Sequence, residues 1–152
     1  MDELEKAISY LEKGDEVEFK LYIHSLDDTT KKAILPDIAK QTSLSYQVSR
    51  WIVEQKELFS TENIARYSRH KELVKSLTES CFNSVRRKAA LNPVLALEDL
   101  TRLVEEKPGD KWVLCGILAN PNCTNEIAEK LSHCPMRQVS SSAHSWLAAC
   151  AR

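Results

Sequence analysis

Glycine is scarce in this sequence, with only Gly14, Gly109 and Gly116 among 152 residues. A phosphate-binding loop needs several glycines close together, and these three lie too far apart to form one. No Gly/Ser-rich stretch divides the chain, so we expect residues 1–152 to form a single domain. The scarcity of glycine therefore excludes the common nucleotide-binding loops and favours one domain without an internal flexible linker.

Closely spaced cysteines are also absent, since no two of the five cysteines form a CxxC motif. They are scattered over the second half of the chain, at Cys81, Cys115, Cys123, Cys134 and Cys150. An odd, scattered set is typical of reduced thiols rather than of a disulfide framework. With His133 and His144 added, the spacings still match no paired zinc-ligand pattern. We therefore expect neither a metal site nor a cofactor.

Long apolar runs are missing as well. No stretch approaches the 18 consecutive apolar residues of a membrane-spanning helix, and the first residues, MDELE, lack the basic and apolar regions of a secretory signal. Hydrophobic residues make up 43% of the chain and charged residues 28%, which are typical values for a globular protein. The sequence thus predicts a cytoplasmic protein without a membrane partner.

Strand patterns are rare, and the apolar residues recur at helical spacing almost throughout. Residues 17–23 alternate like a strand, but Phe19, Ile23 and Leu26 also share one helical face, and no second strand candidate exists to pair with this segment. A further helix is expected from about residue 28, where Pro36 should kink or split it. We therefore predict an all-α fold.

An internal repeat follows from two Asn-Pro pairs. When Asn92-Pro93 is aligned with Asn120-Pro121, apolar positions coincide at a spacing of 28 residues. Val85 meets Val113, and Leu103 meets Leu131. Proline disfavours helical geometry in the residue before it, so each unit is a helix that ends at Asn-Pro, followed by a second helix. Such units cannot bury a face alone, which favours stacking into an α-solenoid.

The segments VRRKAALNPVLALEDLTRL and VLCGILANPNCTNEIAEKL are similar to the leucine-rich repeat variants, whose units read V-R-x-x-x-A-x-N-P-N-x-x-x-E-x-L-x-x-L. The resemblance covers residues 83–150 and implies short helices stacked in a right-handed superhelix. Two departures are the 28-residue period and Leu114, which stands where Arg86 matches the family's arginine. Residues 1–80 contain no cysteine, so the family's iron–sulfur module is not carried over. The N-terminal part, residues 1–80, rests on periodicity alone and leaves a HEAT-like repeat open.

Charge is distributed unevenly along the chain, although the net charge is only −1. Residues 1–28 hold nine acidic residues against three lysines, whereas residues 66–88 hold seven basic residues against two acidic ones. A charge run is usually a solvated helix face, but it can also steer a charged partner. Six basic side chains of this second region are predicted to bind the partner, together with Trp112, which lies beside the expected buried face of its helix. The predicted partner-binding residues are therefore Arg66, Arg69, Lys71, Arg86, Arg87, Lys88 and Trp112.

The alternative interpretation is a DNA-binding regulator. The segment IAKQTSLSYQVSRWIVE, around residues 38–53, resembles a helix-turn-helix whose recognition helix would present Tyr46, Gln47 and Arg50 to the major groove. The match is imperfect, because Ser49 occupies the position that needs an apolar residue and Val48 comes one residue early.

No motif marks a catalytic site, so we expect no enzyme. The sequence favours a non-catalytic interaction scaffold that binds a macromolecule through a basic face. Its partner would be an acidic protein surface or a nucleic-acid backbone, with the protein preferred.

Overall fold

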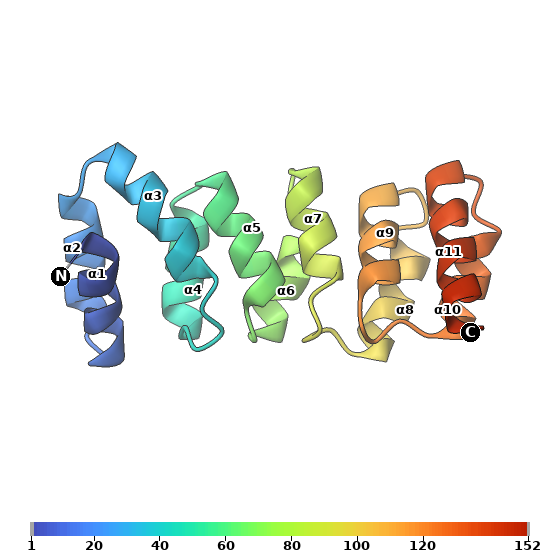
Figure 1. Ribbon diagram of the computed structural model, residues 1–152, viewed down its shortest axis with the longest axis horizontal. Coiled ribbons are helices and arrows are strands. Elements are labelled where there is room, and N and C mark those ends of the chain that lie inside the picture. The colour runs from blue at the N-terminus through green and yellow to red at the C-terminus, as the bar shows by residue number, and fades with distance from the viewer. Residues whose placement is uncertain (1, 152) are drawn as a thin grey trace. The chain divides into compact units, whose positions relative to one another are not determined.

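The computed structural model describes residues 2–151, and within this range it contains eleven α-helices and no strand (Figure 1). The predicted all-α fold is confirmed for these residues. The chain divides into two compact units, one ending at Arg69 and the other beginning at His70. The expectation of a single domain stays a prediction.

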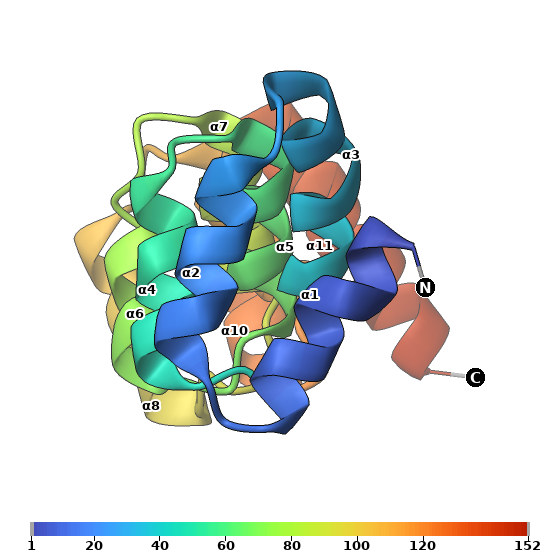
Figure 2. The same cartoon turned by 90° about the vertical axis from the view of Figure 1, so that its left-hand side faces the viewer.

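The first unit contains five helices, of which α1 and α2 lie side by side in Figure 2. Their bounds are α1 (Glu3–Glu12), α2 (Glu16–Ser25), α3 (Asp28–Ala39), α4 (Tyr46–Glu54) and α5 (Leu58–Tyr67). Helix α3 packs against α1, α4 and α5. It runs without a break through Pro36, so of the two predicted effects of this proline, the split is wrong and the kink stays a prediction.

Acidic residues at the start of the chain serve as helix caps. The carboxylates of Asp2, Asp15 and Asp27 accept hydrogen bonds from the backbone N–H groups three residues later, at 2.7, 3.1 and 2.7 Å. A carboxylate at this position satisfies a backbone donor that the helix leaves unpaired and complements the positive end of its dipole. Part of the acidic excess in residues 1–28 therefore has a structural explanation.

The second unit contains six helices: α6 (Lys71–Leu77), α7 (Asn83–Ala90), α8 (Leu97–Glu106), α9 (Lys111–Ala119), α10 (Asn125–Ser132) and α11 (Arg137–Cys150). Helix α9 lies between α7 and α11 and packs against both. In turn, α6, α8 and α10 pack against α7, α9 and α11, respectively. This arrangement places α7, α9 and α11 in a row, which matters for the site described below.

The two Asn-Pro corners of this unit have matching hydrogen bonds. The side-chain oxygen of Asn92 accepts from the N–H of Val94 at 2.9 Å, and that of Asn120 accepts from Asn122 at 2.8 Å. The Asn120 side chain also donates to the carbonyl oxygens of Ala90, at 2.8 Å, and Asn92, at 2.9 Å. Because Asn120 is only 3% exposed, these bonds tie one corner to the next inside the fold.

Candidate functional site

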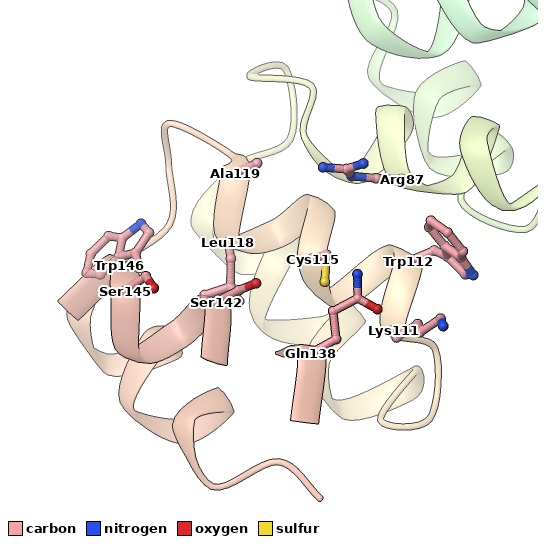
Figure 3. A pocket seen from close by; sticks show the side chains of 10 residues that line it. All are labelled: Arg87, Lys111, Trp112, Cys115, Leu118, Ala119, Gln138, Ser142, Ser145 and Trp146. Atoms are coloured by element: carbon pink, nitrogen blue, oxygen red, sulfur yellow. The ribbon is translucent and has the colours of Figure 1, made fainter. Parts of the chain in front are cut away.

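A groove of about 410 Å³ runs along α9 and is flanked by α7 and α11 (Figure 3). We call it the central groove. Ten side chains line it: Arg87 from α7; Lys111, Trp112, Cys115, Leu118 and Ala119 from α9; and Gln138, Ser142, Ser145 and Trp146 from α11. All of them belong to the second unit. A volume of this size lies within the usual range of ligand sites, about 300–1,000 Å³.

Helical spacing explains why these side chains face one groove. On α11 the lining positions are 138, 142, 145 and 146, which fall on one face of a helix. On α9 they are 111, 112, 115, 118 and 119, on the side away from the fully buried Val113 and Ile117. Burial of the apolar stripe thus turns the polar and aromatic positions of both helices outward.

A glycine on α9 brings Arg87 up to the groove. A methyl group at Gly116 would meet the backbone oxygen of Arg87 and would lie 2.7 Å from the Cβ of Ala90. Real Cβ atoms almost never come this close, so the absence of a side chain allows α7 to approach α9. The guanidinium of Arg87 then reaches the same groove as Trp112.

The electrostatic character of the central groove is positive. Arg87 and Lys111 are both exposed, and none of the ten lining residues is acidic. Among the residues that the structure describes, no carboxylate forms an ion pair with either cation. The Lys111 ammonium lies 5.2 Å from the centre of the Trp112 ring, where the ring's electrons attract it. The groove can therefore attract an anionic group and offer it an aromatic surface.

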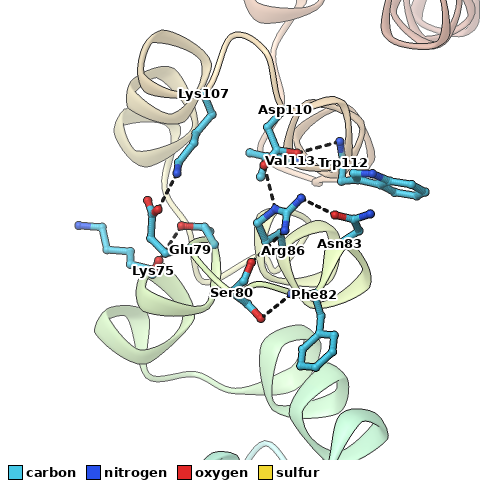
Figure 4. A network of polar contacts seen from close by, with 11 residues as sticks. Lys75, Glu79, Ser80, Phe82, Asn83, Arg86, Lys107, Asp110, Trp112 and Val113 are labelled. Carbon is cyan, nitrogen blue, oxygen red and sulfur yellow. Dashed lines mark hydrogen bonds and ion pairs between the residues drawn. The ribbon is translucent and has the colours of Figure 1, made fainter.

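The neighbouring Arg86 points elsewhere. Its Nε donates to a carboxylate oxygen of Asp110 at 2.8 Å, and its other nitrogens donate to the Ser80 carbonyl and the Asn83 side chain (Figure 4). The other oxygen of Asp110 accepts from the N–H groups of Trp112 and Val113 and so caps α9. Arg86 was predicted as a partner contact, but its hydrogen bonds make it a link between α7 and α9.

Lys71, another predicted partner contact, also lies against a carboxylate of its own unit. Its ammonium is 3.2 Å from Asp99, and that of Lys75 is 3.3 Å from the same group. Burial alone raises the pKa of the Asp99 carboxyl, but the Ala96 N–H and the two ammonium groups outweigh this effect and hold the pKa below its ordinary value. Lys71 therefore stabilises a largely buried carboxylate.

The remaining predicted contacts are dispersed. Arg66 and Arg69 are exposed but belong to the first unit, where the Arg66 guanidinium lies 5.3 Å from the Tyr67 ring centre. Lys88 is partly exposed on α7 and does not line the central groove. Of the seven predicted residues, only Arg87 and Trp112 meet at the groove.

The alternative DNA-binding residues lie on α4. Tyr46, Gln47 and Arg50 are exposed, and Arg50 pairs with Glu54 on the same helix at 3.3 Å. Ser45 caps this helix by accepting from the N–H of Val48. Val48 and Ser49 are each only 1% exposed, so the helix buries a serine next to its apolar residue.

Cysteine and histidine form no metal centre within residues 2–151, where no three potential ligands come together. Cys115 lines the central groove, whereas Cys123 is buried, and burial raises the pKa of its thiol to about 11. No helix in the same range has the length and apolar character needed to span a bilayer.

Sequence reasoning missed Lys111, Gln138 and Trp146. Trp146 lines the groove at the end opposite Trp112 (Figure 3). The signal was present in the spacing, because positions 138, 142, 145 and 146 mark one helical face without an acidic residue.

Comparison of the chain with protein-family models, with curated proteins and with solved structures gives no match. The likeness to the leucine-rich repeat variants therefore rests on the quoted segments alone.

Proposed function

We propose that this protein is a non-catalytic, helical-repeat interaction module that binds an acidic protein through the central groove of its second unit. The observation that carries the proposal is the composition of that groove. It combines two cations, two tryptophans and no acidic residue on α7, α9 and α11, which pack in a row. Tryptophan and arginine are enriched among the residues that dominate binding energy at protein interfaces.

The matching Asn-Pro corners support the repeat part of the proposal. Helices α7 and α9 begin at Asn83 and Lys111, 28 residues apart, and the corners that follow them share one side-chain hydrogen bond, from the backbone N–H two residues later to the asparagine oxygen. A right-handed superhelix of the leucine-rich repeat variant type would present successive helices on one surface. Such a surface suits a macromolecular partner better than a small metabolite.

The charge of the protein favours a protein partner over nucleic acid. A nucleic-acid-binding domain usually carries a strongly basic face, because each neutralised phosphate needs a cation. Here the net charge is −1, and the central groove offers two cations. Two positive charges in a groove that also presents aromatic rings suit a few carboxylates on a protein.

A second candidate function is duplex DNA binding through α4, which the exposed Tyr46, Gln47 and Arg50 favour. The surrounding charge is unfavourable, since residues 1–69 hold thirteen acidic and ten basic residues, a net charge of −3. A phosphate backbone would be repelled by this excess at low ionic strength. We therefore rank this function second.

Affinity capture with matched charge reversals tests the proposal. Wild-type protein is compared with Arg87→Glu/Lys111→Glu in the groove and with Arg102→Glu/Lys130→Glu, an equal charge change at exposed positions of α8 and α10. Extracts are used before and after nuclease treatment. We expect the captured proteins to survive nuclease and the control reversal but to be lost with the groove reversal.

Two results would contradict the proposed function. Captured material that disappears after nuclease would identify a nucleic-acid partner, and Arg50→Ala would then test α4. Equal losses in both double variants would show that the central groove has no special part in binding. Circular dichroism melts of all variants establish that each remains folded.

A further inference from the structure

We infer that the central groove binds an extended acidic peptide segment that carries one large apolar side chain. This inference rests on the proposed function and specifies the part of the partner that enters the groove. It is drawn from three kinds of lining group: cations, aromatic rings and unengaged hydrogen-bonding side chains.

The two cations of the groove favour an acidic segment in the partner. Arg87 lies on α7 and Lys111 at the start of α9, so positive charge reaches the groove from two helices. Within residues 2–151 neither forms an ion pair with a carboxylate of the protein, whereas Arg86 and Lys71 of the same unit do. Carboxylates of a partner are the complementary groups for these two free charges.

The two tryptophan rings of the groove favour a large apolar side chain in the partner. Trp112 and Trp146 stand at opposite ends of the groove, and the largely buried Leu118 lies between them (Figure 3). Both tryptophans are only partly exposed, so each already rests on the protein and presents one remaining surface. A large apolar side chain that enters the groove over Leu118 would lose water on several sides, which is how interface anchors gain most of their energy.

The polar lining favours an extended peptide over a helix. Gln138, Ser142 and Ser145 face the groove from α11, and within the described chain their side chains have no hydrogen-bond partner. The amide of glutamine offers both a donor and an acceptor, as a peptide group does. A helical partner has satisfied its own backbone groups, whereas an extended segment leaves them available for these side chains.

Selection from a random peptide library tests this inference. A phage-displayed library of short peptides is selected on the immobilised full chain and counter-selected on the Arg87→Glu/Lys111→Glu variant. The expected consensus contains two or more acidic residues next to one aromatic or large aliphatic residue. The consensus peptide is then synthesised with a fluorescein label, and its binding is measured by fluorescence anisotropy.

Single substitutions should weaken binding of that peptide in a defined pattern. Trp112→Ala, Trp146→Ala and Arg87→Glu should each raise the dissociation constant at least about tenfold. Gln138→Ala changes an exposed side chain that supports nothing else, so it tests the backbone contacts without a risk to folding. The control Arg102→Glu/Lys130→Glu should leave the dissociation constant within about twofold.

Any one of three binding results would overturn the inference. They are a selected consensus without acidic residues, equal binding of a peptide whose apolar residue is replaced by glycine, and stronger binding of a uridine oligonucleotide than of the peptide. Failure to select any peptide, while captured proteins still depend on Arg87 and Lys111, would refute the extended segment and leave the proposed function intact. If protein capture does not depend on these cations, the proposed function fails as well.

Discussion

Arg86 and Asp110, which are 24 residues apart in the chain, join helices α7 and α9, with 2.8 Å between Nε and the carboxylate oxygen. Their side chains are 17% and 18% exposed, so water screens the pair only weakly. Asp110 also caps α9, and it thereby fixes the start of the helix that carries Lys111 and Trp112. The link between α7 and α9 therefore also sets the geometry of the central groove.

A double-mutant cycle at this pair should reveal the coupling. Asp110→Ala removes both the helix cap and the ion pair, and we expect it to lower the free energy of unfolding more than Arg86→Ala does, by about 1–3 kcal/mol. The coupling energy should be about 0.5–3 kcal/mol in urea denaturation. Arg102→Ala, on the exposed side of α8, is the control. Strictly additive effects would mean that Arg86 and Asp110 do not interact.

Alanine at two glycines should have opposite consequences. Gly116→Ala forces a methyl group against the backbone of α7, and overpacking of this kind costs about 1–3 kcal/mol. Gly109 has nothing within 4 Å of the added Cβ and no positive φ, so Gly109→Ala should change stability by less than about 0.5 kcal/mol or raise it slightly. Thermal melts of the two variants provide the comparison. Equal melting temperatures would show that α7 and α9 pack less closely than described.

Stability should depend on pH through Asp99. The pKa of this carboxyl is lower in the folded protein than in the unfolded chain, so its stabilising effect is fully present above about pH 4 and is lost as the pH falls through the folded value. Asp99→Asn should therefore reduce the free energy of unfolding at neutral pH and flatten its decline in acid. Urea denaturation over the acidic range measures both curves, with the exposed Glu98→Gln as control. Parallel curves for the wild type and Asp99→Asn would contradict this assignment.

Ser49 should tolerate alanine. Its hydroxyl is buried and has no hydrogen-bond partner in the described chain. Burial of an unpaired hydroxyl costs roughly 1–3 kcal/mol, so Ser49→Ala should leave stability unchanged or raise it by about 1 kcal/mol. Ser60→Ala is the contrast, because the equally buried Ser60 hydroxyl donates to Glu57. A loss of stability in Ser49→Ala as large as in Ser60→Ala would indicate a bonding partner for Ser49.

The sequence predicted the local features well. Asn-Pro corners and apolar spacing identified helices in the second unit, because proline geometry and helical periodicity act within a few residues. The same apolar spacing predicted that Trp112 lies beside the buried face of its helix. In the structure, Trp112 lines the central groove. Non-local contacts could not be foreseen. Arg86 looked like an outward charge because its acceptor, Asp110, ends the short connection KPGD between α8 and α9, whose path the periodicity does not determine.

The first Asn-Pro corner of the second unit is completed by the second one. The Ala90 and Asn92 carbonyls are bonded by Asn120, and those of Pro93 and Leu95 by the amide of Asn122. On the ribosome, these acceptors emerge before their side-chain donors, which follow them in the chain by 27 to 30 residues. The unit should therefore assemble from its N-terminal end, because the corner after α9 supplies the hydrogen-bond donors that complete the corner after α7.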